Sequence, residues 1–167
     1  MNFIDRTRDT GTAERILSLA QWQSARATWP AGEPVAVALA NDDDPKHLAA
    51  DVARIALIVL HFPKWVDGRA YSQARLLRSR WRYGGELRAV GEVLVDMLPL
   101  LERTGFDAVQ LREDQSVEAA QRALTFFPGH YQGDVRDNRP LFAKPPGTAD
   151  ALARGAAREF ISEGASI

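Results

Sequence analysis

Apolar and polar blocks alternate along the chain with lengths that fit β-strands and helices in turn. Short, largely apolar runs cover residues 35–40, 55–62, 86–91 and 106–111, and each has the length of a buried strand. A segment with helical spacing follows each run, and the last of these segments begins after Ser116, a residue suited to a helix cap. Short connections between alternating strands and helices imply parallel pairing with right-handed crossovers.

This pattern predicts an α/β fold in which four consecutive βα units form a parallel sheet. Continuous apolar strands are typical of a sheet that is covered on both faces. Four units fit either a half-barrel-like arrangement or a small doubly wound sheet, and both alternatives stay open at this point. A half barrel would leave edges and one face uncovered, so it would favour a homodimer.

The two ends of the chain have different patterns. Residues 12–29 show helical spacing and are expected to form an N-terminal helix with Thr12 as its cap, whereas residues 1–11 are expected to be disordered. Residues 128–167 are expected to form a proline-rich extended tail with a terminal helix over 148–163. The predicted organisation is therefore an N-terminal extension over 1–34, a core over 35–127 and a tail over 128–167.

Charge and composition exclude several classes of function. The net charge of −1 gives no sign of a nucleic-acid partner or an anionic membrane partner. No apolar run reaches the roughly 18 residues of a membrane span, and the N-terminus does not resemble a signal peptide, so a cytoplasmic location is expected. The chain has no cysteine, and its three histidines form no metal-binding motif, so neither thiolate chemistry nor a metal site is predicted.

Polar residues gather where the predicted strands end, which is where parallel α/β folds bind ligands. The loop after the second strand is the richest, because seven basic and two acidic residues lie between Lys64 and Arg88. Guanidinium groups and the free N–H groups at a helix start both favour oxyanions. We therefore predict a small-oxyanion site whose candidate ligands are Lys64, Arg69, Tyr71, Ser72, Arg75 and Arg88.

Asp67 and Asp114 are the candidate catalytic acid–base residues, because each lies in one of these loops. The same residues also fit a structural interpretation, in which Asp67 caps the following helix and the arginines form a solvated helix face. In the first loop, the aspartates at 42–44 fit a helix cap before Pro45 better than they fit a magnesium site.

Residues 41 to 132 resemble a known family. The characteristic pieces are "FPKWVDGRAYSQARLLR", "GELRAVGEVL" and "GFDAVQLREDQ", with "YQ" at 131–132, and they are similar to the bacterial family named domain of unknown function 934. Its members are often labelled as probable oxidoreductases in sulfite reduction, so the resemblance implies a functional association with sulfite reductase. The chain departs from the family pattern at Arg82, where glycine is common, and at Met97, where glutamine is common.

Three functions remain open. The first is an accessory or anion-binding protein associated with assimilatory sulfite reduction. The second is a small oxidoreductase with a soluble flavin or nicotinamide, although the chain has no GxGxxG or P-loop motif and the cofactor stays unknown. The third is a structural docking partner of sulfite reductase that binds through the helix over 71–82 and the tail.

Overall fold

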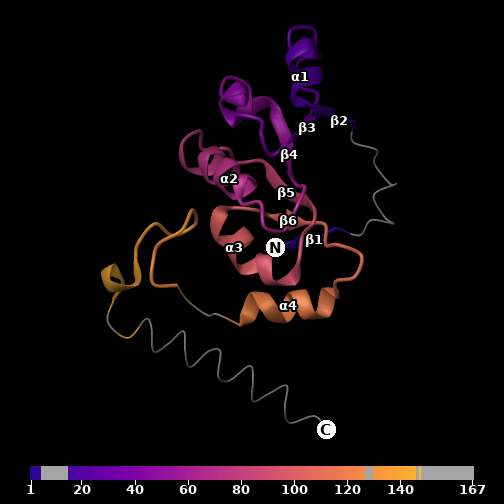
Figure 1. The fold of residues 1–167 in the computed structure, drawn as a ribbon. Helices are drawn as coiled ribbons and strands as arrows, with labels where there is room; N and C mark the ends of the chain where they lie inside the picture. Colours follow the sequence, from indigo (N-terminus) through magenta and orange to yellow (C-terminus); the bar gives the residue numbers. More distant parts are fainter. Residues whose placement is uncertain (5–14, 127–129, 146, 148–167) are drawn as a thin grey trace.

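All strands in the described part of the chain join one parallel sheet (Figure 1). The computed structural model describes residues 1–4, 15–126, 130–145 and 147. The strands stand in the order β1-β6-β5-β4-β3-β2, and every neighbouring pair is parallel. Their bounds are β1 (Asn2–Phe3), β2 (Ile16–Ser18), β3 (Val35–Leu39), β4 (Ile55–Phe62), β5 (Glu86–Gly91) and β6 (Ala108–Val109). The predicted α/β fold with a parallel sheet is confirmed.

The α-helices pack on one face of this sheet (Figure 1). They are α1 (Leu19–Ala25), α2 (Arg69–Ser79), α3 (Leu98–Thr104) and α4 (Val117–Thr125), with 3₁₀ turns η1 (Pro45–Leu48), η2 (Val52–Arg54), η3 (Val95–Met97) and η4 (Leu141–Ala143). Trp22, Leu77, Leu101 and Ala120, one from each α-helix, share a single buried cluster with alternate strand residues. Among the described residues, no helix has the length and apolar character needed to cross a membrane.

The opposite face of the sheet bears no helix in the part of the chain that the structure describes. Ala36, Leu57 and Val59 form a separate small cluster there, with Ala38 and Val90 packed against it. We call the side of the sheet that carries these residues the helix-free face. A doubly wound sheet has helices on both faces, so the described elements follow the half-barrel-like alternative.

The N-terminal segment differs from its prediction. Ile16–Ser18 form the edge strand β2 beside β3, so the expected helix over 12–29 was wrong at residues 16–18, and α1 begins only at residue 19. The Ser18 side chain accepts a hydrogen bond from the Gln21 backbone N–H at 3.2 Å, and the Gln21 side chain accepts one from the Ser18 N–H at 2.8 Å. The open edge of β3 overrides the weak helical preference of this segment by offering backbone hydrogen bonds. Thr12 lies outside the described residues.

The first residues of the chain also differ from their prediction. Residues 2 and 3 form β1 instead of being disordered, because the N–H of Asn2 donates to the Asp107 carbonyl at 2.7 Å and that of Ile4 donates to the Val109 carbonyl at 2.9 Å. These bonds add β1 to the edge of the sheet beyond β6. The rest of the segment expected to be disordered, from residue 5 onward, lies outside the described residues.

The segment after β3 begins with the predicted cap but continues differently. The Asp44 carboxylate accepts from the Lys46 N–H at 2.9 Å, and Pro45 occupies the first helical position, as predicted. The expected helix that follows is replaced by the two 3₁₀ turns η1 and η2. Asp51, 7% exposed, lies between them and accepts hydrogen bonds from the Trp22 and Arg26 side chains, and these bonds hold the chain against α1.

The described part of the tail is folded, whereas the sequence predicted an extended chain. The Asp134 carboxylate accepts from the N–H groups of Arg136 and Asp137, which closes a tight turn. The Arg136 guanidinium then pairs with Glu102 of α3 at 2.9 Å. The predicted terminal helix over 148–163 lies outside the described residues, and the predicted domain boundaries stay predictions.

Candidate functional site

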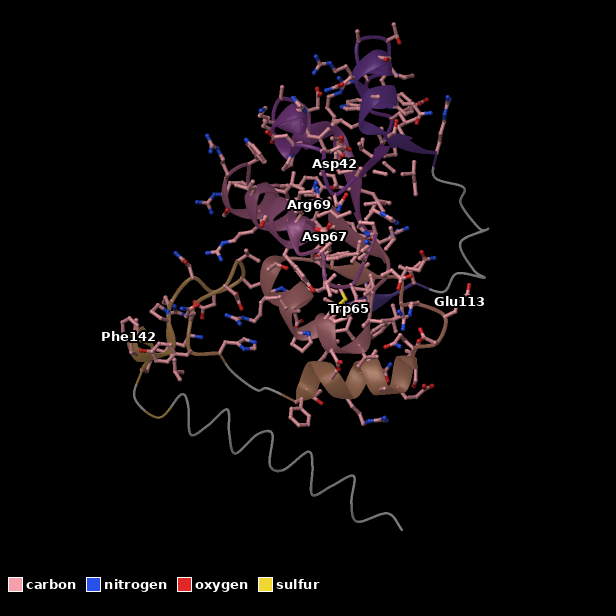
Figure 2. All side chains as sticks on the ribbon, in the orientation of Figure 1. Asp42, Trp65, Asp67, Arg69, Glu113 and Phe142 are labelled. Carbon is pink, nitrogen blue, oxygen red and sulfur yellow. The ribbon has the colours of Figure 1, made fainter. Side chains whose placement is uncertain are left out.

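Asn41, Asp67 and Arg69 form one polar cluster where β3 and β4 end. Figure 2 shows Asp67 and Arg69 close together. Arg69 Nη2 lies 2.7 Å from Asp67 Oδ2, and Asn41 Nδ2 donates to the same oxygen at 2.6 Å. Asp67 Oδ1 also accepts from the Arg69 backbone N–H at 3.2 Å. The bonds from Arg69, with a smaller contribution from Asn41, lower the pKa of Asp67 to about 2. Asp67 is therefore ionised at neutral pH and already neutralises Arg69.

Arg112 joins the loops after β5 and β6 in a second cluster. Its guanidinium lies 2.6 Å from Asp114 through Nε and 2.8 Å from Glu92 through Nη1. A further bond from Nη2 to Asp114, at 2.7 Å, makes the Asp114 contact bidentate. The bonds from Arg112, with a smaller contribution from Gln115, lower the pKa of Asp114 to about 2. Asp114 thus pairs with its own neighbour Arg112, and no described contact joins it to Arg69 or Arg88.

The two candidate catalytic carboxylates therefore lie in separate ion-paired clusters. A carboxylate with a pKa near 2 holds no proton to donate at neutral pH and accepts one weakly, because a general base works best with a pKa near the working pH. The catalytic assignments of Asp67 and Asp114 stay predictions. The geometry shows that both residues have structural roles. Asp67 connects its own loop to the loop after β3 through Asn41, and Asp114 holds the Arg112 guanidinium in place.

The predicted ligands on α2 point in different directions. Tyr71 is partly buried against the Phe62 ring, with ring centroids 5.1 Å apart, and burial raises the pKa of Tyr71 to about 12. Ser72 and Arg75 are exposed, and Arg75 has no ion-pair partner among the described residues. Gln73, buried on the same helix, donates to the Ala40 and Asp43 carbonyls at 2.8 Å each and so anchors the β3 loop to α2.

The loop between β4 and α2 presents its middle residues to solvent. Lys64 is exposed and has no ion-pair partner in the described part of the chain. Trp65 (Figure 2) and Val66 follow it, and their exposed fractions are 57% and 65%. This loop therefore offers one unpaired cation beside two exposed apolar side chains.

Arg88 lies on the helix-free face and not in a loop. In the strand register it stands between Val59 of β4 and Ala108 of β6. Its side chain is only 12% exposed, and its one described polar contact joins Nε to Glu86 Oε1 at 2.9 Å. The two terminal amino groups of Arg88 have no protein partner among the described residues, and they keep some access to solvent.

His61 and Gly91 lie next to Arg88 on the carboxyl side of the sheet. His61 is two residues beyond Val59 and pairs in register with Val90, so it shares the helix-free face with Arg88. Gly91 has φ of 96°, and a Cβ there would come within 3.0 Å of His61 Nε2 and would contact the Phe62 carbonyl oxygen. Glycine at 91 therefore leaves the space in which the exposed imidazole lies.

Sequence reasoning missed His61, although a signal was present. His61 is the only strongly polar residue in the apolar run of β4. Gln110 likewise interrupts the apolar run over 106–111, directly after β6. Because alternate residues of a strand share a face, these two positions and Arg88 all fall on the helix-free face. The predicted oxyanion ligands stand on different elements: Lys64 lies in the loop after β4, Arg69 and Arg75 on α2, and Arg88 on β5.

The acidic loop after β3 is engaged in structural bonds. Asp43 Oδ2 accepts from the Ala40 N–H at 2.8 Å, while Asp44 caps η1 and lies 2.8 Å from Lys46 Nζ. Among the described residues, no group of three or more histidine and acidic side chains is arranged to hold a metal ion.

Comparison with known proteins places the chain in a family without giving it an activity. No curated protein and no solved structure matches it. The model of a bacterial protein family of unknown function, DUF934, matches residues 36–142, which run from β3 to η4 and include both ion-paired clusters and Arg88. This match spans more than half of the chain, so the protein belongs to the DUF934 family.

Proposed function

We propose that the protein binds a small inorganic oxyanion through Arg88 on the helix-free face, as a cytoplasmic accessory protein in assimilatory sulfite reduction. The observation that carries the proposal is the state of the Arg88 side chain. It is 12% exposed, yet Glu86 is its one described polar partner. A guanidinium fork with two unpaired amino groups matches two oxygens of an oxyanion.

The surroundings of Arg88 strengthen such an interaction. Val59 and Ala108 flank the guanidinium stem on the two neighbouring strands, and both are buried, at 5% and 0% exposure. Charges interact more strongly where protein replaces water. His61 lies towards the carboxyl end of the strands from Arg88 on the same face of the sheet, where an imidazole N–H adds a donor for a remaining oxygen.

Other members of the predicted ligand set are less suited to this task. Asp67 already occupies the guanidinium of Arg69 with bonds as short as 2.7 Å, so an incoming anion would have to compete with a carboxylate. Arg75 lies on the exposed side of α2, where salt and water weaken ion pairs. The choice of sulfite among oxyanions follows the family resemblance, and measurement has to decide it.

Isothermal calorimetry tests the site with sulfite, sulfate and phosphate at low ionic strength. We expect Arg88→Met to weaken binding by about tenfold or more, because a charged hydrogen-bond pair is lost. Arg88→Lys keeps the positive charge but loses the guanidinium fork. Its affinity should therefore lie between those of the native protein and Arg88→Met. Arg75→Met is the matched control, since it removes an exposed arginine and should leave the affinity unchanged. Equal affinities for Arg88→Met and the native protein would refute the site.

The link to sulfite reduction needs its own measurement. Sulfite reductase should turn over faster at limiting sulfite when the native protein is added, and adding Arg88→Met should give no increase. If the native protein did not accelerate the reductase, the accessory role would be refuted. The calorimetric result for oxyanion binding would stand independently.

A second candidate function is docking onto sulfite reductase, and the loop after β4 favours it. Trp65 and Val66 are adjacent apolar residues with exposed fractions of 57% and 65%, and tryptophan is enriched at the centres of protein interfaces. Co-purification of the reductase with the native protein and with Trp65→Ser separates the alternatives. Equal recovery with both would argue against docking through this loop.

A further inference from the structure

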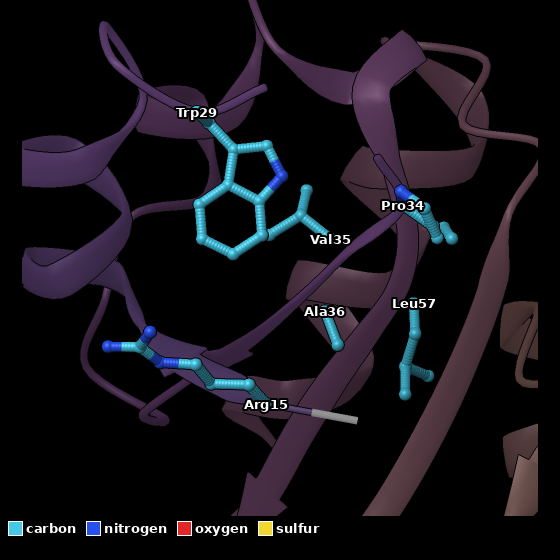
Figure 3. A pocket seen from close by; sticks show the side chains of 7 residues that line it. Arg15, Trp29, Pro34, Val35, Ala36 and Leu57 are labelled. Atoms are coloured by element: carbon cyan, nitrogen blue, oxygen red, sulfur yellow. The ribbon is translucent and has the colours of Figure 1, made fainter. Parts of the chain in front are cut away.

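A pocket lies at the opposite end of the sheet, beside the amino-terminal ends of β3 and β4 (Figure 3). Its volume is about 90 Å³. The lining residues are Arg15, Trp29, Pro34, Val35, Ala36, Ala56 and Leu57. The pocket reaches the helix-free face through Ala36 and Leu57, but it contains neither Arg88 nor any residue of the two ion-paired clusters.

The apolar part of the lining is held firmly in place. Val35, Ala36 and Leu57 are strand residues with exposed fractions of 2%, 6% and 4%. The indole N–H of Trp29 donates to the Glu33 carbonyl at 3.3 Å, and the Trp29 carbonyl accepts from Arg54 Nη2 at 3.5 Å. A fixed aromatic wall needs little ordering when a ligand arrives, so less binding energy is lost.

Arg15 is the charged residue among the described residues of this lining. It is exposed and has no hydrogen-bond or ion-pair partner among the described residues. Figure 3 shows the Arg15 side chain on the side of the pocket opposite Trp29, with Ala36 and Leu57 to one side of both. The described lining residues therefore join an unpaired cation to an aromatic and aliphatic surface, and none of them is acidic.

From this geometry we infer a second binding site, which takes a small organic carboxylate with a short apolar or aromatic part. The carboxylate pairs with the guanidinium of Arg15 in a bidentate manner. The apolar part packs on Trp29 and Leu57, because small-molecule sites are mostly apolar with a few placed polar groups. An inorganic oxyanion would leave the apolar wall unused, and a cation would be repelled by Arg15.

Tryptophan fluorescence tests this inference on the full chain, with benzoate as the probe. Benzamide has nearly the same shape without the charge, and phosphate has the charge without the apolar part. We expect saturable quenching by benzoate, with binding at least tenfold weaker for benzamide and no displacement by phosphate. Equal binding of benzoate and benzamide, or displacement by phosphate at similar concentration, would overturn the inference.

Variants assign the signal to this pocket. Arg15→Met should weaken benzoate binding by about tenfold or more, and Arg15→Gln provides the same test if the methionine variant does not fold. Arg15→Lys should restore part of the affinity, whereas Arg75→Met and Arg88→Met should leave it unchanged. Trp29→Phe should remove the quenching while calorimetry still detects binding. Full benzoate affinity in both neutral Arg15 variants would show that the carboxylate binds elsewhere.

Discussion

Arg78 is a structural clamp, and its removal should destabilise the protein strongly. Its side chain is 14% exposed. Nε donates to the Gly105 carbonyl at 2.9 Å, and Nη1 donates to the carbonyls of Tyr83 and Gly85 at 2.6 and 2.8 Å. Nη2 pairs with the Asp107 carboxylate. One guanidinium thus joins the end of α2 to the start of β5 and to the turn before β6.

The substitution Arg78→Met keeps the apolar stem and removes all of these donors. Breaking one partner of a buried ion pair costs about 3–5 kcal/mol. We place Arg78→Met at the lower end, about 3–4 kcal/mol, because Asp107 is 42% exposed and keeps a bond from the Leu87 N–H at 2.9 Å. With a urea dependence of about 2 kcal/mol per molar, the unfolding midpoint should fall by roughly 1.5–2 M.

Urea unfolding followed by circular dichroism measures this shift. Arg75→Met is the matched control, since it lies one turn earlier on α2 and is exposed without an ion-pair partner in the described residues. Its unfolding free energy should stay within about 0.5 kcal/mol of the native value. If the two variants unfolded at the same urea concentration, Arg78 would not act as a clamp, and its described bonds would contribute no net stability.

Three further predictions concern single positions. Arg82 has φ of 52°, so Arg82→Gly should raise the free energy of unfolding by about 1 kcal/mol in urea titrations, because non-glycine residues are strained there. Gly91→Ala should lower it by about 2 kcal/mol or more, since φ is 96° and the new Cβ would meet the Phe62 carbonyl oxygen. Asp67 has a folded-state pKa of about 2 against an ordinary value of 3.8; its contribution to stability should therefore be complete above pH 4 and disappear as the pH falls towards 2. Urea midpoints over this range should fall less steeply for Asp67→Asn than for the native protein, and equal slopes would show that the pair with Arg69 does not stabilise the fold.

The central strands were predictable, whereas the edges of the sheet were not. The predicted bounds of β4 and β5 agree with the structure at both ends, because long runs in the middle of a sheet are selected by burial on each side. The edge strands β1 and β2 have two and three residues. Segments this short show no measurable hydrophobic periodicity in the sequence. Their pairing is determined by the free backbone hydrogen-bonding groups at the edges of β6 and β3.

The sequence did not predict which partners the candidate site residues would have. The predicted anion and acid–base residues were given separate roles, whereas the structure pairs Asp67 with Arg69 and Asp114 with Arg112. In both cases an acid and an arginine are two residues apart, and Glu86 with Arg88 has the same spacing. This spacing was visible in the sequence, but it does not tell which arginines have donors left over, because that depends on contacts between distant segments.

The number of acceptors around each arginine separates structural arginines from a binding arginine. Arg78 and Arg88 are buried to a similar degree, with side chains 14% and 12% exposed. Arg78 has three carbonyls and a carboxylate around it, whereas Glu86 is the one described partner of Arg88. A buried arginine with few partners is costly, and an apolar residue of similar volume is often as stable or more stable. Arg88→Met should therefore be nearly neutral in urea unfolding while it removes oxyanion binding. A loss of stability as large as that of Arg78→Met would instead make Arg88 a part of the scaffold.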